Sequence, residues 1–407
     1  MANDIATGSF PEYWSRRMQI KLKKTKVYRV VSNFEEVGTL KNGDTVHRPY
    51  RSELVVNDLG AEGSYSRQDI SDSNEYLTID NSPEVTFYLK DPDEIQSNYK
   101  TANEYADDAA DKLGDRIDGR ITGEYDQADS IVANFEVGGG GTASDGIGFT
   151  LGTSNIVKAL GRAMKKLSRL DVPVADRWGI ISPDFYNELW EFIAGKESLL
   201  GDNSGQNGDI GKYGGFRLYM SNACGWSARL EFGTNPTAND TIVINGVTLT
   251  FKATLAAAGD LHIGTAVTDT LTNMVAAINT PGTSITEAAT TGFTALSAAN
   301  QKLMKDIAAV NGTTYMTLKG YGKSYVAVSE TLSAAADIWT LTKQLQHNLF
   351  GQGKPIDLVI QKAINLKIKD RDGYLGKDFV SWAMFGKKTF DEGDKKLVDM
   401  QIRSDAF

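Results

Sequence analysis

The chain has 407 residues, 41% of them hydrophobic and 23% charged, which is typical of a globular protein with a sizeable buried core. Its net charge of -9 argues against a protein that binds nucleic acid without sequence preference, because such proteins usually present a net basic face. The single cysteine, Cys224, excludes a disulfide within the chain, and neither a signal-peptide pattern nor a membrane-spanning apolar run is present, so we expect folding in a cytosol.

Residues 1–40 are predicted to form an arm instead of the start of a compact domain. Phe10, Trp14, Met18 and Leu22 recur every four residues, which gives a short helix one apolar face. The remainder of this helix is basic, with Arg16, Arg17, Lys21, Lys23 and Lys24. Such a basic face either docks on an acidic partner or on nucleic acid, or is simply solvated, and the sequence leaves the two interpretations equally open.

Residues 41–92 are predicted to form a long β-hairpin. Asn42-Gly43 is a turn signal, and Pro49 limits the strand that follows it to a sheet edge. The second strand is predicted at 84–90, where apolar and polar residues alternate with period two. Because an isolated two-stranded ribbon is only marginally stable in water, we expect it to lie on another surface.

A long helix is predicted over 93–133, because apolar residues step by three or four from Ile95 to Ala128. Its opposite face is acidic, with Asp107, Asp111 and Asp115 spaced by four. Like charges at this spacing usually form a solvated face, which we favour over a cation site. Three glycines, Gly114, Gly119 and Gly123, predict that the second half of this helix bends or loosens.

A glycine-rich linker is predicted over 137–148. It follows a helix and lacks the Lys-Ser/Thr pair of a phosphate-binding loop, which would follow a strand. We therefore interpret it as a linker that gives the backbone conformational freedom, and as a candidate hinge. The hinge candidates are Gly138, Gly139, Gly140 and Gly141.

Beyond the linker, the pattern predicts a helix ending before Pro173, then a short apolar strand and a helix capped by Ser182. From about 228 the composition shifts to Thr, Ala, Asn and Gly, which indicates an inserted domain over 228–345. Its predicted elements are a hairpin at 239–252 with an Asn245-Gly246 turn, helices at 268–280 and 300–310, and a strand at 314–320. Two long strands joined by an Asp372-Gly373 turn follow.

The sequence contains no constellation for catalysis, a cofactor or a metal. His47, His262 and His347 are scattered without a second ligand at metal spacing. Cys224 has no histidine or CxxC partner and is predicted to be a buried structural thiol. Residues 370–378 superficially look like a calcium loop, but their acidic residues are misplaced and a hairpin turn is favoured. We therefore expect a protein that is not an enzyme.

Four stretches resemble, in their amino-acid sequence and in their order along the chain, the major capsid proteins of tailed double-stranded DNA bacteriophages. They are FPEYWSRRMQIKL (10–22), LKNGDTVHRP (40–49), LDVPVADRWGIISPDFYNEL (170–189) and GGFRLYMSN (214–222). The resemblance covers nearly the whole chain except about 228–345. It implies the α+β Hong Kong-97-like capsid fold, which encapsulins share, with a small inserted α/β domain in the axial region.

The resemblance also implies a division of the chain. The expected parts are an N-terminal arm (1–40), an extended loop (41–92), a peripheral domain (93–175) with a spine helix (93–133), a first axial part (176–227), the inserted domain (228–345) and the axial return with C-terminal peripheral strands (346–407).

The function implied is a virion protein that assembles with itself, as pentamers and hexamers, into an icosahedral head around double-stranded DNA, in the cytoplasm of a bacterial host. A portal, a separate scaffold and a decoration protein are the implied partners, without sequence-specific DNA binding and without a membrane. An encapsulin-type shell and an adhesin that binds through 228–345 remain alternatives. The candidate inter-subunit contacts are Trp14, Arg16, Arg17, Lys21, Lys23, Lys24, Arg48, Tyr50, Arg51, Glu62, Arg67, Asp107, Asp111 and Asp115.

Overall fold

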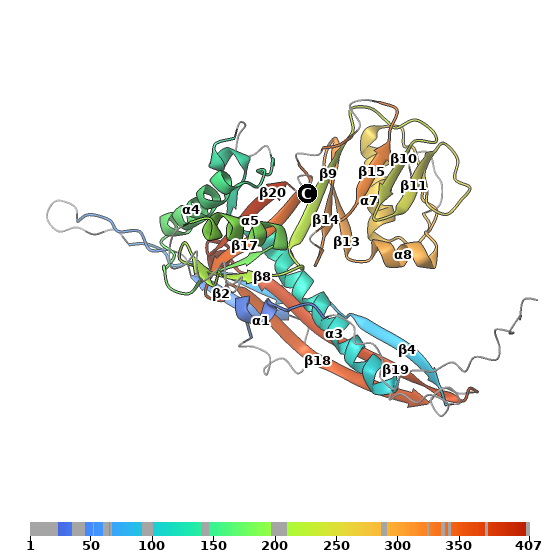
Figure 1. Ribbon diagram of the computed structural model, residues 1–407, viewed down its shortest axis with the longest axis horizontal. Coiled ribbons are helices and arrows are strands. Elements are labelled where there is room, and N and C mark those ends of the chain that lie inside the picture. The colour runs from blue at the N-terminus through green and yellow to red at the C-terminus, as the bar shows by residue number, and fades with distance from the viewer. Residues whose placement is uncertain are drawn as a thin grey trace, which may run out of the picture.

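The computed structural model describes most of the chain. The described residues are 23–34, 45–51, 53–59, 65, 67–91, 101–139, 146–196, 210–285, 291–323, 325–334, 338–340, 343–370 and 373–403. Figure 1 shows a central body, an elongated part built on two long strands, a thin ribbon that projects at the opposite end, and a lobe that lies above the elongated part.

The elongated part is a four-stranded sheet covered by a helix. Its strand order is β1 (Ser32–Asn33), β18 (Ile356–Asp370), β19 (Gly376–Thr389) and β4 (Glu84–Lys90). Helix α3 (Thr101–Thr122) lies along this sheet (Figure 1) and buries Leu113, Ile117 and Ile121. The described part of the turn between β18 and β19 includes Gly373 with φ of 78°, as the hairpin prediction requires.

The helix is shorter than the 93–133 predicted from its apolar period. It gives way at Gly123 to a 3-10 helix, η3 (Gly123–Gln127), and then to strand β5 (Ser130–Val132). Tyr125 continues the apolar spacing and is buried, but in the 3-10 turn and not in an α-helix. The predicted loosening therefore occurs at the third glycine, while Gly114 and Gly119 remain helical.

The ribbon pairs differently from the prediction. Strand β2 (Thr45–Arg51) pairs with β3 (Asp72–Thr78), in a two-stranded antiparallel sheet. The expected partner, β4, instead pairs with β19, and Phe87 stacks on Phe379 with ring centroids 4.8 Å apart. The period-two pattern identified β4 as a strand, but a local pattern carries no information about which strand lies beside it.

A ten-stranded sheet runs through the body and continues into the lobe (Figure 1). Its main path is β13-β14-β9-β17-β6-β8-β7, with β16, β20 and β5 attached to it. The bounds are β6 (Arg177–Ile181), β7 (Lys212–Tyr213), β8 (Phe216–Met220), β9 (Gly225–Glu231), β13 (Ile307–Asn311), β14 (Tyr315–Gly320), β16 (Ile338–Trp339), β17 (Leu345–Gln352) and β20 (Leu397–Arg403). The chain also forms three short helices, α1 (Tyr28–Val31), η4 (Asn134–Val137) and α9 (Asp391–Asp394).

Two helices cover the body sheet (Figure 1): α4 (Thr153–Arg169) and α5 (Pro183–Ala194). Ser182 caps α5 as predicted, because its hydroxyl accepts a hydrogen bond from the Phe185 amide at 3.3 Å. Both helices pack with Phe350 and the apolar residues of β20 in one hydrophobic cluster.

The lobe, which we define as Trp226–Trp339, has a hydrophobic cluster of its own. It adds a second sheet of β12 (Asp260–His262), β11 (Val247–Lys252), β10 (Thr241–Ile244) and β15 (Val328–Thr331), with helices α7 (Val267–Asn279) and α8 (Ala298–Met304). The Asn245-Gly246 turn is confirmed, with φ of 50° and 80°, and so is the helix predicted at 268–280. The helix predicted at 300–310 is wrong beyond Met304, because 307–311 forms strand β13.

Candidate interaction surfaces

The ribbon carries an exposed apolar surface beyond the end of β2. Four apolar side chains there are 67–95% exposed: Leu54, Val55, Val56 and Leu59. Single exposed apolar residues are normal on a protein surface, but a group of them marks an interaction site. The two sides of the ribbon are held together here by Gln68, whose side-chain oxygen accepts a hydrogen bond from the Val55 amide at 2.9 Å. This apolar surface has no covering element among the described residues, and we call it the ribbon surface.

The base of the ribbon is attached to the body by two of the candidate contact residues. Arg48 pairs with Asp357 at 2.6 Å and lies over the Phe390 ring, 4.5 Å from its centroid. The Tyr50 hydroxyl donates a hydrogen bond to Glu392 at 2.9 Å. Both residues therefore anchor the ribbon within the chain. The candidates Arg51 and Arg67 are exposed on it, and Glu62 lies outside the described residues.

One lysine of the arm pairs with the acidic face of α3 within the same chain. Lys26 forms ion pairs with Asp111 and, at 3.6 Å, with Asp115. The acidic face of α3 is thus partly neutralised by its own chain, and Asp107 remains exposed. Of the other arm candidates, Lys23 and Lys24 are exposed, and Trp14, Arg16, Arg17 and Lys21 lie outside the described residues.

Asp118 holds the arm at the next turn of α3. Its Oδ1 accepts hydrogen bonds from the amides of Val27 and Tyr28, both at 2.8 Å. Burial raises the pKa of this carboxyl to about 6, although the two backbone N–H groups act in the opposite direction. The sequence places Asp118 close to the acidic face of the helix, but it does not show that this residue is buried, because its burial depends on the arm lying across it.

Asp118 should make the stability of the subunit pH dependent. A carboxyl whose folded pKa is raised stabilises the fold when protonated, so this contribution is present below pH 3.8 and is lost as the pH rises through about 6. The difference corresponds to about 3 kcal/mol. We expect Asp118→Asn, whose amide oxygen still accepts both bonds, to match the wild type near pH 4 and to exceed its free energy of urea unfolding at pH 7. Exposed Asp107→Asn is the control, and equal curves for wild type and Asp118→Asn would contradict the assignment.

Three residues far apart in the sequence form a buried polar array in the body sheet. His347 Nδ1 lies 2.8 Å from Asp399 Oδ2, and His347 Nε2 lies 2.8 Å from the Ser227 hydroxyl. The Tyr125 ring stacks on the imidazole, with centroids 3.7 Å apart. This order of groups is that of a hydrolase triad, but all three side chains are at least 93% buried, so a substrate cannot reach the hydroxyl. The array ties β9, β17 and β20 together, and its spacing gave no signal in the sequence.

The lobe meets helix α3 at a close contact between two glycines. A Cβ on Gly119 would lie 2.7 Å from the Cα of Gly322, so neither position has room for a side chain. Around this contact Arg116 pairs with Asp306, Lys319 pairs with Asp126 at 2.5 Å, and Arg120 lies 4.2 Å from the centroid of the Tyr321 ring. These contacts fasten the lobe to the elongated part.

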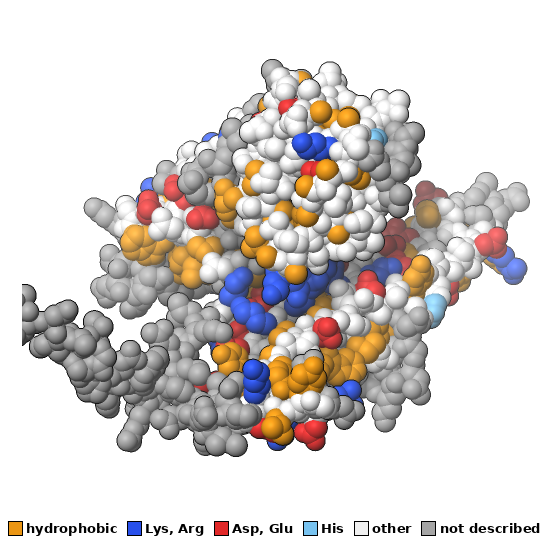
Figure 2. Space-filling view, turned by 90° about the vertical axis from the view of Figure 1, so that its right-hand side faces the viewer, with side chains coloured by type: hydrophobic (Ala, Val, Ile, Leu, Met, Phe, Trp, Pro, Cys, Tyr) orange, Lys and Arg blue, Asp and Glu red, His pale blue; other side chains and the backbone are white. Residues whose placement is uncertain are grey.

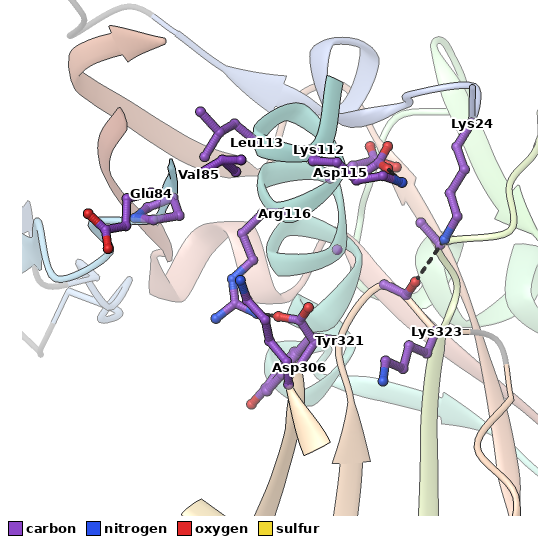
Figure 3. A pocket seen from close by; sticks show the side chains of 16 residues that line it. Lys24, Glu84, Val85, Lys112, Leu113, Asp115, Arg116, Asp306, Tyr321 and Lys323 are labelled. Carbon is purple, nitrogen blue, oxygen red and sulfur yellow. Dashed lines mark hydrogen bonds and ion pairs between the residues drawn. The ribbon is translucent and has the colours of Figure 1, made fainter. Parts of the chain in front are cut away.

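A cavity of about 290 Å³ opens beside this contact, which we call the lobe–helix cleft. Its lining comes from the arm, β4, α3 and the lobe (Figure 3). Figure 2 shows lysine and arginine side chains gathered in the crevice where the lobe meets the elongated part. The basic residues that line the cleft are Lys24, Lys112, Arg116, Lys305 and Lys323.

The hinge candidates are only partly within the described chain. Gly138 follows η4 with φ of 101°, a backbone conformation that favours glycine, and nothing lies near its missing Cβ. Gly139 lies against the Asn134 side chain, and Gly140 and Gly141 lie outside the described residues.

Cys224 is buried as predicted, and burial raises the pKa of its thiol well above the ordinary value.

Two further features are absent from the described residues. No group of three or more His, Cys, Asp or Glu side chains is placed to hold a metal ion within this part of the chain. None of the helices in the described ranges is long and apolar enough to cross a membrane.

Sequence comparison gives no relatives, and structure comparison gives several. No protein-family model matches the chain, and no curated protein matches it. A chain from Mycobacterium phage Che8 matches with a TM-score of 0.55 and 14% identity, over 97% of this chain and 98% of that chain. A chain from the capsid structure of cyanophage P-SCSP1u matches with a TM-score of 0.55 and 12% identity, over 98% of this chain and 95% of that chain. A chain from the asymmetric unit of the mature capsid of bacteriophage PhiM1 matches with a TM-score of 0.52 and 10% identity, over 97% and 92%. Over nearly its whole length, therefore, this protein has the α+β fold of chains found in bacteriophage capsids.

Proposed function

We propose that this protein is the major capsid protein of a tailed double-stranded DNA bacteriophage, a structural subunit without catalytic activity. The observation that carries the proposal is the extent of the fold similarity, which covers 97–98% of this chain and at least 92% of each of the three capsid-like chains. No large segment is left over for a separate activity. Fold alone does not determine function, so the exposed surfaces must also suit assembly.

The ribbon surface suits assembly because none of the described residues of its own chain covers it. The ribbon projects away from the body (Figure 1), and its apolar side chains are among the most fully exposed of the described residues. Contact with a second copy of the chain would bury them. A ribbon on one subunit and its acceptor on the next form a head-to-tail contact, which closes into rings when the rotation between subunits allows.

The parts of the chain take corresponding roles in this proposal. Residues 1–40 are the arm, 41–92 the extended loop, 93–175 the peripheral domain, and 176–227 with 346–407 the axial domain and returning strands. The lobe corresponds to the inserted domain of 228–345. Pentamers and hexamers of the subunit form the head of a Hong Kong-97-like capsid, assembled in a bacterial cytoplasm around DNA that is bound without sequence specificity. A portal, a separate scaffold and a decoration protein are the proposed partners.

Electron microscopy of the protein expressed alone tests this function. We expect closed shells, or rings of pentamer and hexamer size, and a monodisperse monomer at high concentration would refute the proposal. The triple variant Val55→Ser, Val56→Ser, Leu59→Ser should remain folded and soluble, because these side chains are 67–95% exposed, but should no longer assemble. Val174→Ser is the matched control, since Val174 is 66% exposed on another loop and should leave assembly unchanged. Normal assembly of the triple variant would rule out the role of the ribbon surface.

A further inference from the structure

The lobe–helix cleft has an unbalanced set of charges. Of its five cations, Arg116 pairs with Asp306 and Lys112 pairs with Asp115 at 3.2 Å. The other three are Lys24, Lys305 and Lys323, and no carboxylate forms an ion pair with them among the described residues. Lys24 donates a hydrogen bond to the Gly322 carbonyl, at 3.4 Å.

The carboxylates that line the cleft are already engaged or lie away from these lysines. Asp306 and Asp115 form ion pairs with the two cations just named. Asp118 accepts hydrogen bonds from two backbone N–H groups of the arm. Glu84 is exposed, and Figure 3 shows it beyond α3, on the opposite side from Lys24 and Lys323. The positive charge on the lysine side of the cleft therefore has no counterion among the residues that the structure describes.

Lys24 and Lys323 line the same cavity from opposite walls, the arm and the lobe, and Figure 3 shows both on the same side of α3. Lys323 is half-buried, and burial together with repulsion from Lys24 lowers its pKa. Two ammonium groups held near one another in this way gain most from an anion with several acceptor oxygens, because one such group can neutralise both.

We propose that the lobe–helix cleft binds a phosphate group, held by Lys24 and Lys323 with Lys305 at its rim. The group can belong to free inorganic phosphate or to the backbone of a nucleic acid, since both present the same oxygens. Bound there, it bridges the arm and the lobe and adds a contact to those that already fasten the lobe to α3. Phosphate binding at this site does not require shell formation. The experiment below can therefore contradict the site without contradicting the proposed function, and the reverse is also true.

Calorimetric titration of the full-length protein with inorganic pyrophosphate tests the site. We expect binding that weakens with added salt, and a loss of about tenfold or more in affinity for Lys24→Gln and for Lys323→Gln, the loss typical of a charged hydrogen bond. Lys302→Gln is the matched control, because Lys302 is an exposed lysine on α8 outside the cleft and should bind as the wild type does. Thermal unfolding should show that both cleft variants remain folded, since each replacement keeps a long polar side chain.

A competing thymidine oligonucleotide distinguishes the two phosphate sources. Displacement of pyrophosphate by the oligonucleotide, lost in Lys323→Gln, would assign the site to a nucleic-acid backbone. Pyrophosphate binding without displacement would assign it to free phosphate. Absence of pyrophosphate binding, equal binding by the cleft variants, or binding of oligoglutamate in place of pyrophosphate would overturn the proposal.

Discussion

Replacing Gly119 with alanine should destabilise the subunit more than most single substitutions, by about 2 kcal/mol or more, as expected for overpacking against an immovable neighbour. The new Cβ would lie 2.7 Å from the Cα of Gly322, where the obstacle is backbone that cannot rotate away. Relief requires the lobe to move off α3, which weakens the Arg116–Asp306 pair. Urea unfolding should show the loss, and limited proteolysis should show earlier release of the lobe.

Gly161→Ala is the matched control for this substitution. Gly161 is also inside a helix, α4, but it is exposed and a Cβ there meets nothing. Alanine should therefore stabilise the protein by about 1 kcal/mol, the ordinary difference in helix propensity. If Gly119→Ala were equally stabilising, the close approach of α3 and the lobe would not exist in solution.

The second large effect is expected at the buried ion pair between Glu124 and Lys387. Glu124 is 6% exposed in η3, where its carboxylate accepts hydrogen bonds from Lys387 and, at 2.9 Å, from the Thr389 hydroxyl. Removing the cation alone, with Lys387→Met, leaves a buried carboxylate without a counterion and should lower the free energy of unfolding by about 3 kcal/mol. Helix η3, which follows α3, would then lose a polar contact with β19.

A double-mutant cycle tests this pair. Glu124→Gln with Lys387→Met should be much less destabilising than the sum of the two single changes, because neither substitution then leaves a buried charge. Additive effects would show that the two side chains do not interact. The exposed pair Lys395–Glu392, at 3.0 Å, supplies the control, and Lys395→Met should leave the unfolding midpoint unchanged because water screens both charges.

The local elements of this fold could be predicted from the sequence because their signals are local. The Ser182 cap, the Asn245-Gly246 turn and the helix over α7 each depend on residues within one or two turns. Order along the chain, and not any single motif, indicated the capsid-like fold, and the structure comparison bears this out at identities where sequence alone gives no match.

The contacts that assemble these elements could not be predicted, because they join residues far apart. Strand β4 was predicted, but its pairing with β19 depends on a segment almost 300 residues away. Gly119 was interpreted as a weak point in a helix, whereas it is the place where the lobe approaches most closely. Lys24 belongs to the basic pattern of the arm, but its place beside Lys323 could not be predicted, because the two line one cleft only after the lobe has docked on α3.

The way the chain enters and leaves the lobe has a consequence for how such a protein can change over time. Strands β9 and β17 are antiparallel neighbours, and Ser227 lies directly opposite Leu345. Entry and exit are therefore about 5 Å apart, the spacing of paired strands. The lobe, although more than a hundred residues long, therefore connects two neighbouring strands in the same way as a tight hairpin turn would. An ancestor without the lobe, or a descendant with a different one, would need no other rearrangement of the body, so this edge of the sheet is a natural point for exchanging modules.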